Sequence, residues 1–350
     1  MPKRVLAAAG AALALAALTP AVAGAATRNA FAGGDEVVRS APDQFSPNAF
    51  LRKTMTVHVG DTVRWQFRGF HTVTFPVRGE DPPAFITPGQ DRVTGVTDAA
   101  GQPLWFNNQV PTLLPNPEAA GPVAGSTYNG TRLRNSGLPT GTRPRPYRLR
   151  FTRTGSFDYY CVVHPGMEGT VRVVSRRRRV PTEAQNRAAA TSELARLVAN
   201  ARRTAREDSS SAATVEVGRA PRGQRFTLNA FFPSQMSVKV GQPVTFTMAG
   251  QNTTEAHTVT FGPKAYTDTI EPIGPNGLNP LAAYPSDPPP TLPPLTPANH
   301  GNGFLNAGLL DNDSASPQPN RAAVTFGAPG AYAYVCLLHP GMAGTITVTP

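Results

Sequence analysis

The stretch CVVHPGM at residues 161–167 recurs as CLLHPGM at residues 336–342. The two copies contain both cysteines of the 350-residue chain. Each copy places a thiol, an imidazole and a thioether within one short segment. A motif matched at this length and spacing indicates that the chain contains an internal duplication, which then decides the fold.

The duplication extends to both sides of the motif, where alternating hydrophobicity marks short strands. Alternation of apolar and polar residues is typical of a half-buried strand. Matched segments of this kind are 55–60 with 236–241, 62–67 with 243–248, 71–75 with 257–261, 148–151 with 323–326, 157–161 with 332–336, and 169–173 with 344–348. Many short strands separated by turns predict a mainly β protein with two antiparallel sandwich or barrel domains.

Residues 1–25 have the pattern of a secretory signal peptide. Lys3 and Arg4 precede an apolar run over 5–18, and the small-residue pattern AGA stands at 23–25. We therefore expect an exported protein, periplasmic or extracellular after removal of this segment. The apolar run is short for a membrane span, and no later segment is long enough, so no membrane span is expected.

The mature chain divides into two β domains and a linker, predicted at 26–175, 214–350 and 176–213. Within the linker, 181–207 is rich in Ala, Arg and Glu, and we expect it to be a charged helix capped by Thr182. Long sections rich in Pro, Gly and Asn, at 76–145 and 262–320, interrupt the strands of each domain. Because GTRLRNSGL at 130–138 matches GNGFLNAGL at 301–309, we expect these insertions to be ordered.

The net charge of +11 is spread unevenly along the chain. Residues 214–350 carry six Lys and Arg against seven Asp and Glu, so the second domain is close to neutral. The one basic cluster, Arg176 to Arg179, lies in the linker. No nucleic-acid recognition motif accompanies it, so we expect no nucleic-acid binding. A solvated linker is the favoured interpretation, and contact with an anionic surface through Arg176–Arg179 stays open.

Each repeat contains four side chains that suit a metal. A thiolate, two imidazoles and a weak axial thioether are the donors of trigonal copper sites. The predicted ligands are His71, Cys161, His164 and Met167 in the first repeat, and His257, Cys336, His339 and Met342 in the second. Zinc is the competing metal, but a thioether is a poor zinc ligand. A disulfide between the cysteines would not explain why His and Met follow each at the same spacing.

On these residues, each repeat resembles a small blue-copper protein of the plastocyanin/azurin (cupredoxin) family. The resemblance covers most of 41–175 and 222–350, and the Cys-x2-His-x2-Met spacing is similar to the amicyanin type. It implies a Greek-key β-sandwich in each domain, one type 1 copper ion per domain and electron transfer with redox partner proteins. The insertions at 76–145 and 262–320 depart from the family pattern.

An enzymatic role is not expected. Catalytic copper in cupredoxin-type enzymes needs further histidines, but the chain has six, and four are already predicted ligands. No His-x-His pair is present. Two other functions stay open beside electron transfer: extracytoplasmic copper storage or delivery, and a surface interaction module in which copper is structural. Neither His58 nor His300 has a histidine at its matched position, so neither is assigned to copper.

Overall fold

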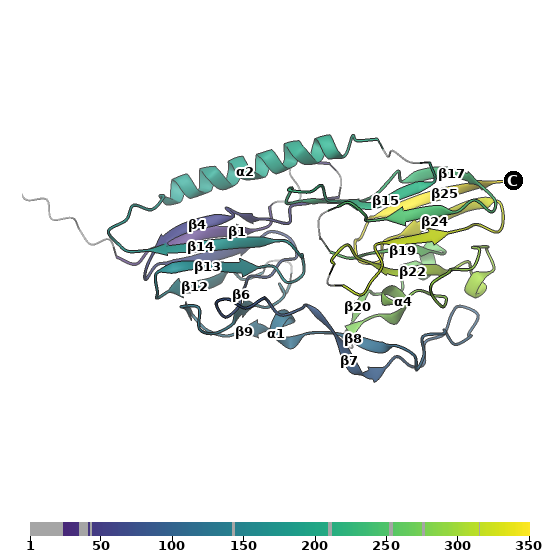
Figure 1. Ribbon diagram of the computed structural model, residues 1–350, viewed down its shortest axis with the longest axis horizontal. Coiled ribbons are helices and arrows are strands. Elements are labelled where there is room, and N and C mark those ends of the chain that lie inside the picture. Colours follow the sequence, from purple (N-terminus) through teal and green to yellow (C-terminus); the bar gives the residue numbers. More distant parts are fainter. Residues whose placement is uncertain are drawn as a thin grey trace, which may run out of the picture.

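The computed structural model describes residues 24–34, 41–42, 44–141, 144–208, 212–251, 255–274, 277–314 and 316–350. The predicted signal peptide therefore lies outside the described residues, apart from its last two positions. Two β domains lie end to end, and helix α2 (Glu183–Thr204) runs along one side of the molecule (Figure 1).

The first domain consists of two sheets packed face to face. One sheet has the order β10 (Thr127–Tyr128), β12 (Tyr147–Phe151), β5 (Thr62–Phe67), β1 (Thr27–Ala32) and β3 (Phe50–Leu51). The other has the order β4 (Thr54–His58), β14 (Glu168–Val174), β13 (Gly155–Tyr160), β6 (Thr74–Phe75), β11 (Arg134–Ser136) and β9 (Pro122–Val123). The short helix α1 (Pro117–Ala120) precedes β9.

The second domain repeats this plan. Its first sheet has the order β2 (Phe45–Ser46), β16 (Thr227–Phe232), β15 (Thr214–Arg219), β18 (Val244–Thr247) and β23 (Arg321–Val324). The second sheet has the order β17 (Gln235–Lys239), β25 (Ala343–Thr349), β24 (Gly330–Val335), β19 (His257–Phe261) and β22 (Leu305–Leu310). Short helices α3 (Lys264–Thr267), α4 (Pro280–Ala283) and η1 (Asn299–Gly301) lie in its insertion.

The predicted fold class, mainly β with two sandwich domains and a helical linker, is confirmed. The sheets are mixed, however, rather than purely antiparallel: β1 runs parallel to β5, and β4 parallel to β14. The second domain has the same two parallel pairs, β15 with β18 and β17 with β25. The opening strands β1 and β15 lie outside the matched strand pairs taken from the sequence.

An aromatic cluster fills the core of each sandwich. In the first domain, the Trp65 ring lies edge-on to Phe75 and to Tyr159, with centroids 5.4 Å apart in both pairs. In the second, Phe246 takes the place of Trp65 and contacts Phe261 and Tyr334. Burial of these large apolar rings is a main source of stability for each domain.

Helix α2 confirms the linker prediction and packs against both domains. Thr182 accepts a hydrogen bond from the Gln185 backbone, and the Gln185 side chain caps Thr182 in return. The helix buries Leu197, together with its own Ala190, Val198 and Ala201, against residues of both repeats. These are Phe45, Ala49, Leu51, Phe226 and Leu228. Strand β2 precedes most of the first domain in sequence, yet it pairs with β16 of the second. The domains are therefore joined by a buried apolar contact.

The described residues of both insertions are ordered, as expected from their matched segments. Asn306 on β22 accepts a hydrogen bond from Thr260 and donates to the carbonyls of Leu281, Ala282 and Tyr284. In the first domain, Asn135 on β11 does the same for the loop around α1, through Thr74. One buried amide thus fastens each insertion to its sheet.

The first insertion also reaches across to the second domain. It forms a hairpin of β7 (Ile86–Arg92) and β8 (Pro111–Pro115), near a small hairpin of β20 (Ile273–Gly274) and β21 (Gly277–Leu278). Beyond β7, Trp105 donates a hydrogen bond to the Pro285 carbonyl, and Tyr284 donates one to the Pro111 carbonyl. The two insertions therefore form a second contact between the domains.

In the described part of the chain, no helix combines the length and the apolar character that a bilayer span requires.

Replacing Asn306 with Ala should lower the free energy of unfolding by about 3 kcal/mol, because the buried Thr260 hydroxyl loses its acceptor and several buried carbonyls lose their donor. Urea denaturation of the metal-free protein measures the change. Gln235→Ala, on the exposed edge of β17, is the control and should change stability little. An equal, small effect of both substitutions would contradict this role of the amide.

The contact between the insertions should weaken at alkaline pH. His300 lies between Asp98 and Asp287, with each ring nitrogen 3.2 Å from a carboxylate oxygen. The hydrogen bond to Asp287 raises the pKa of His300, despite its burial. The stabilisation that protonated His300 contributes is therefore complete below its pKa in the unfolded chain, about 6.5. It is lost as pH rises through the raised pKa of the folded protein.

The measurement is the difference in unfolding free energy between wild type and His300→Asn as a function of pH. Asn tolerates the positive φ of 50° at this position. The difference should be largest below the unfolded pKa of about 6.5 and should shrink as pH rises through the raised pKa of His300. A difference independent of pH would contradict the prediction.

Candidate metal centres

The four predicted ligands of each repeat come from two places in the fold. His71 stands just before β6, and His257 opens β19. Cys161 and Cys336 directly follow β13 and β24, so the strand ends set their positions. Each short loop then leads into the last strand of its domain.

Backbone hydrogen bonds close both ligand loops. In the first, the Cys161 amide donates to the Met167 carbonyl at 3.0 Å, and the Met167 amide donates to the His164 carbonyl at 3.0 Å. The second loop repeats these bonds at 2.9 and 3.1 Å between Cys336, His339 and Met342. The loop cannot open without breaking them, so cysteine, histidine and methionine are held together.

In the first centre, three donor atoms converge. The Nδ1 atoms of His71 and His164 are 3.0 Å apart, and the Cys161 sulfur lies 3.9 Å from the first and 3.4 Å from the second. In the second centre, the Cys336 sulfur lies 3.7 Å from Nδ1 of His257 and 3.4 Å from Nδ1 of His339. The sequence prediction therefore named side chains that the fold brings together.

A threonine directly follows the first histidine of each centre, His71 or His257, and holds the cysteine in place. The Thr72 amide donates to the Cys161 sulfur at 3.3 Å, and the Thr72 hydroxyl accepts from the Val162 amide at 2.9 Å. Thr258 makes both contacts in the second centre, at 3.4 Å to Cys336 and 2.8 Å from the Leu337 amide. An amide aimed at the sulfur stabilises a thiolate there.

Two glycines pack against the first histidine of each centre, His71 or His257, a contact that the sequence did not predict. Gly33 and Gly218 both have positive φ, of 77° and 70°. A Cβ atom at Gly33 would lie 2.4 Å from Nε2 of His71, and one at Gly218 would lie 2.8 Å from Nε2 of His257. Only glycine leaves room for the imidazole at these positions. The sequence signal is weak: Gly33 directly follows the opening strand β1, and Gly218 lies near the end of β15.

Both thiols are buried, yet their surroundings favour the thiolate. Burial raises the pKa of Cys161, but the His164 charge and hydrogen bond, with the Thr72 and Val163 amides, bring it below the ordinary value. For Cys336, burial is likewise outweighed, mainly by the hydrogen bond and charge of His257. A lowered thiol pKa prepares both sulfurs to bind a metal ion.

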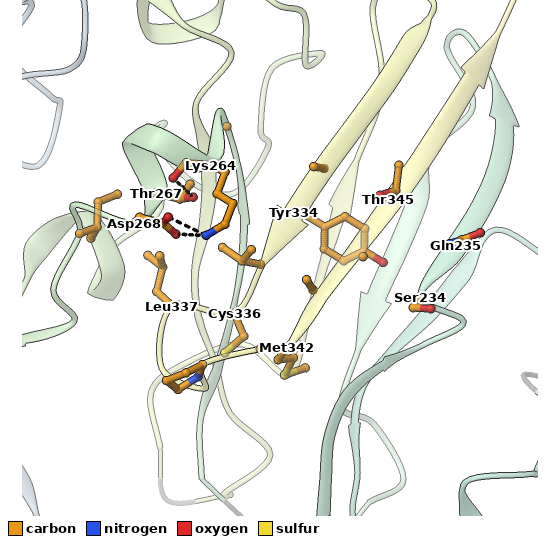
Figure 2. Close-up of a pocket in the computed structure, with 18 residues that line it drawn as sticks. Ser234, Gln235, Lys264, Thr267, Asp268, Tyr334, Cys336, Leu337, Met342 and Thr345 are labelled. Carbon is orange, nitrogen blue, oxygen red and sulfur yellow. Dashed lines mark hydrogen bonds and ion pairs between the residues drawn. The ribbon is translucent and has the colours of Figure 1, made fainter. Parts of the chain in front are cut away.

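The methionines lie inside the protein next to the cysteines. Met167 is 2 % exposed and Met342 is 1 % exposed. Figure 2 shows Cys336 and Met342 close together at one end of a surface pocket, with Lys264 and Asp268 at another part of its rim. The placement agrees with the predicted axial role of the thioether, which stays a proposal.

A buried carboxylate next to the second centre was also missed. Glu255 is 9 % exposed, and its Oε1 lies 3.7 Å from Nε2 of His339. Burial raises its pKa, but the charges of His164, His339 and His257 bring it below the ordinary value. The sequence contained one clue: sixteen positions separate Gly241 from His257, whereas eleven separate Gly60 from His71.

The chain matches no protein-family model and no curated protein. Among solved structures it is similar to oxidised plastocyanin from Dryopteris crassirhizoma, at 20 % identity over 39 % of this chain and 99 % of that chain, with a TM-score of 0.20. It is also similar to reduced auracyanin from Roseiflexus castenholzii (18 % identity, 40 % and 100 % covered, TM-score 0.23) and to amicyanin from Paracoccus versutus (15 %, 41 % and 87 %, 0.22).

Two mainly β sandwiches, each with a His–Cys–His group, confirm the predicted resemblance to a tandem cupredoxin. The donor groups also fit one ion each. Bonds of about 2.0 Å to nitrogen and 2.3 Å to sulfur, as in zinc sites, would separate trigonal donors by roughly 3.5 to 3.7 Å.

The thiols of the metal-free protein should titrate below the range of an ordinary cysteine, because histidine and amide contacts outweigh burial. The stability that they contribute is therefore complete above the unfolded pKa of about 8.5 and is lost as pH falls through the lowered pKa. Ultraviolet absorbance of the thiolate follows the titration. Cys161→Ser and Cys336→Ser resolve the two thiols, and the denatured protein is the control. A folded midpoint at or above the denatured one would contradict the prediction.

Proposed function

We propose that this protein is an exported electron carrier with two type 1 copper sites, one in each β domain. The observation that carries the proposal is the convergence of two imidazole Nδ1 atoms and one cysteine sulfur at the same place in both repeats. A buried methionine on the same loop completes the donor set in each. Thiolate and thioether favour copper over the harder divalent ions.

The protein's own residues prepare this site before an ion arrives. Thr72 and Thr258 hold the sulfurs by their amides, and burial lowers the pKa of His339, which favours the neutral imidazole that a metal requires. Copper bound there would supply a one-electron couple between Cu(II) and Cu(I). Because the closed loops fix the donors, little rearrangement accompanies a change of charge.

The two remaining histidines are engaged elsewhere, which favours a carrier over an enzyme. Nε2 of His58 lies 2.7 Å from the Arg178 carbonyl, and His300 lies between two aspartates. Neither belongs to a donor group in the described residues. The substrate of the proposed activity is therefore an electron, exchanged with redox partner proteins.

Copper titration of the metal-free protein should reach two ions per chain, with an intense visible band from thiolate-to-copper charge transfer. Cys161→Ser and Cys336→Ser should each keep one ion and one band, because each removes a single thiolate, and the double variant should keep neither. Copper analysis and visible spectroscopy give both readouts.

The matched control is His58→Gln, which changes a histidine outside both donor groups and should leave two ions and both bands. A copper-loaded wild type without the visible band would overturn the proposed site. Loss of copper during repeated reduction and oxidation at an electrode would instead favour storage or delivery.

A further inference from the structure

We propose that the two metal centres form an intramolecular electron-exchange pair across the domain interface, with Glu255 as the buried carboxylate that joins them. The inference rests on the proposed copper function and deepens it, because it states where an electron goes from one centre. It follows from how the second ligand loop, Glu255 and the segment around Asn48 meet between the domains.

The ligand loop of the second centre lies against the chain of the first repeat. A Cβ atom at Gly341 would lie 2.5 Å from the Gln44 side-chain nitrogen, so the loop approaches this residue closely. The Gln44 carbonyl in turn accepts a hydrogen bond from the Asn229 amide of β16. Next to it, β2 pairs with β16 and thereby extends a sheet of the second domain. One side of the second ligand loop therefore contacts the first repeat, while Cys336 and Met342 line the surface pocket.

Glu255 occupies this interface and is held from both sides. The Asn48 side chain, from the first repeat, donates to Oε2 of Glu255 at 3.0 Å and also contacts the Thr227 hydroxyl. The other carboxylate oxygen lies 3.7 Å from Nε2 of His339. A buried carboxylate is tolerated where polar and charged partners surround it. Asn48 thus fixes the carboxylate against the outer edge of a ligand imidazole.

The first centre is linked to the same carboxylate through the backbone. A Cβ atom at Gly33 would lie 2.4 Å from Nε2 of His71, so this glycine packs against the imidazole. The Gly33 amide donates to the Ala49 carbonyl at 2.9 Å, and the preceding residue, Asn48, donates to Glu255. A chain of contacts therefore runs from His71 through Asn48 and Glu255 to His339.

The bridge is a difference between the two repeats. The longer loop before His257 contains Glu255 two positions before the histidine, whereas Gly69 stands two positions before His71. At this matched position, only the second repeat therefore contributes a carboxylate. Two like charges facing each other there would repel, and a single one can be shared.

The exchange itself transfers a single electron. The centre that gives it is oxidised from Cu(I) to Cu(II), and the centre that receives it is reduced from Cu(II) to Cu(I). No bond forms or breaks, and no proton moves. A one-electron donor protein would reduce the pair, and a one-electron acceptor protein would oxidise it.

Pulsed EPR on the full chain, loaded with Cu(II) at both centres, tests the pair directly. A dipolar coupling with one narrow distance distribution is expected in wild type and should be absent from Cys161→Ser and Cys336→Ser. A broad distribution or no coupling, with both visible bands present, would overturn the pair but not the copper sites. If wild type fails to bind copper at one centre, the proposed function fails and this inference fails with it.

The role of Glu255 is tested by Glu255→Gln, which removes the charge and keeps the shape. Because a nearby negative charge stabilises the oxidised ion, the reduction potentials of both centres should rise, measured one at a time in the two single-centre backgrounds. Glu271→Gln removes an exposed carboxylate of the same domain and is the matched control, with no shift expected. Unchanged potentials in Glu255→Gln, with unfolding of the metal-free variant like wild type, would overturn the assignment.

Exchange within the molecule is tested by kinetics. After a small organic radical rapidly reduces part of the copper, redistribution between the centres should proceed at a rate independent of protein concentration. A rate proportional to protein concentration would mean exchange between molecules and would overturn the proposal.

Discussion

Each candidate centre depends on one local constraint, the double contact between a threonine and the cysteine loop. The amide of Thr72 or Thr258 points at the sulfur, and its hydroxyl accepts the amide that follows the cysteine. Because the residue before each threonine is the ligand candidate His71 or His257, this contact sets the separation between imidazole and thiolate. A buried amide or sulfur without a partner would cost free energy, so the loop has one favourable position. The convergence of donors follows from it in both repeats.

The repeats share this constraint but differ in what surrounds it. The first insertion extends a hairpin toward the second domain, and the segment with Asn48 supplies both a strand and a hydrogen-bond donor to it. The second repeat contributes the longer loop with Glu255. Helix α2 adds apolar contacts to both domains. The two repeats are therefore not equivalent in the folded chain, because each contributes different segments to the contact between the domains.

Much of the fold and most of each candidate site could be predicted from the sequence. Alternation identified β5, β13 and β14 with their counterparts, since a half-buried strand needs that pattern. The ligand loops were recognised because their donors lie within seven residues. Strands β1 and β15 carried a weaker pattern, and Gly33 and Gly218 could not be linked to the histidines, because their contact depends on how the sheets pack.

The sequence by itself determined the duplication, the β class of both domains, the capped linker helix and the identity of the converging donors. These depend on residue type, on short-range spacing and on matching between the copies. Only the tertiary structure decided that a segment of the first repeat contacts the second ligand loop, that β2 belongs to the second domain's sheet, and that Glu255 lies beside His339. Such contacts join residues far apart in the chain, and their geometry is fixed by packing, for which spacing along the sequence gives no measure.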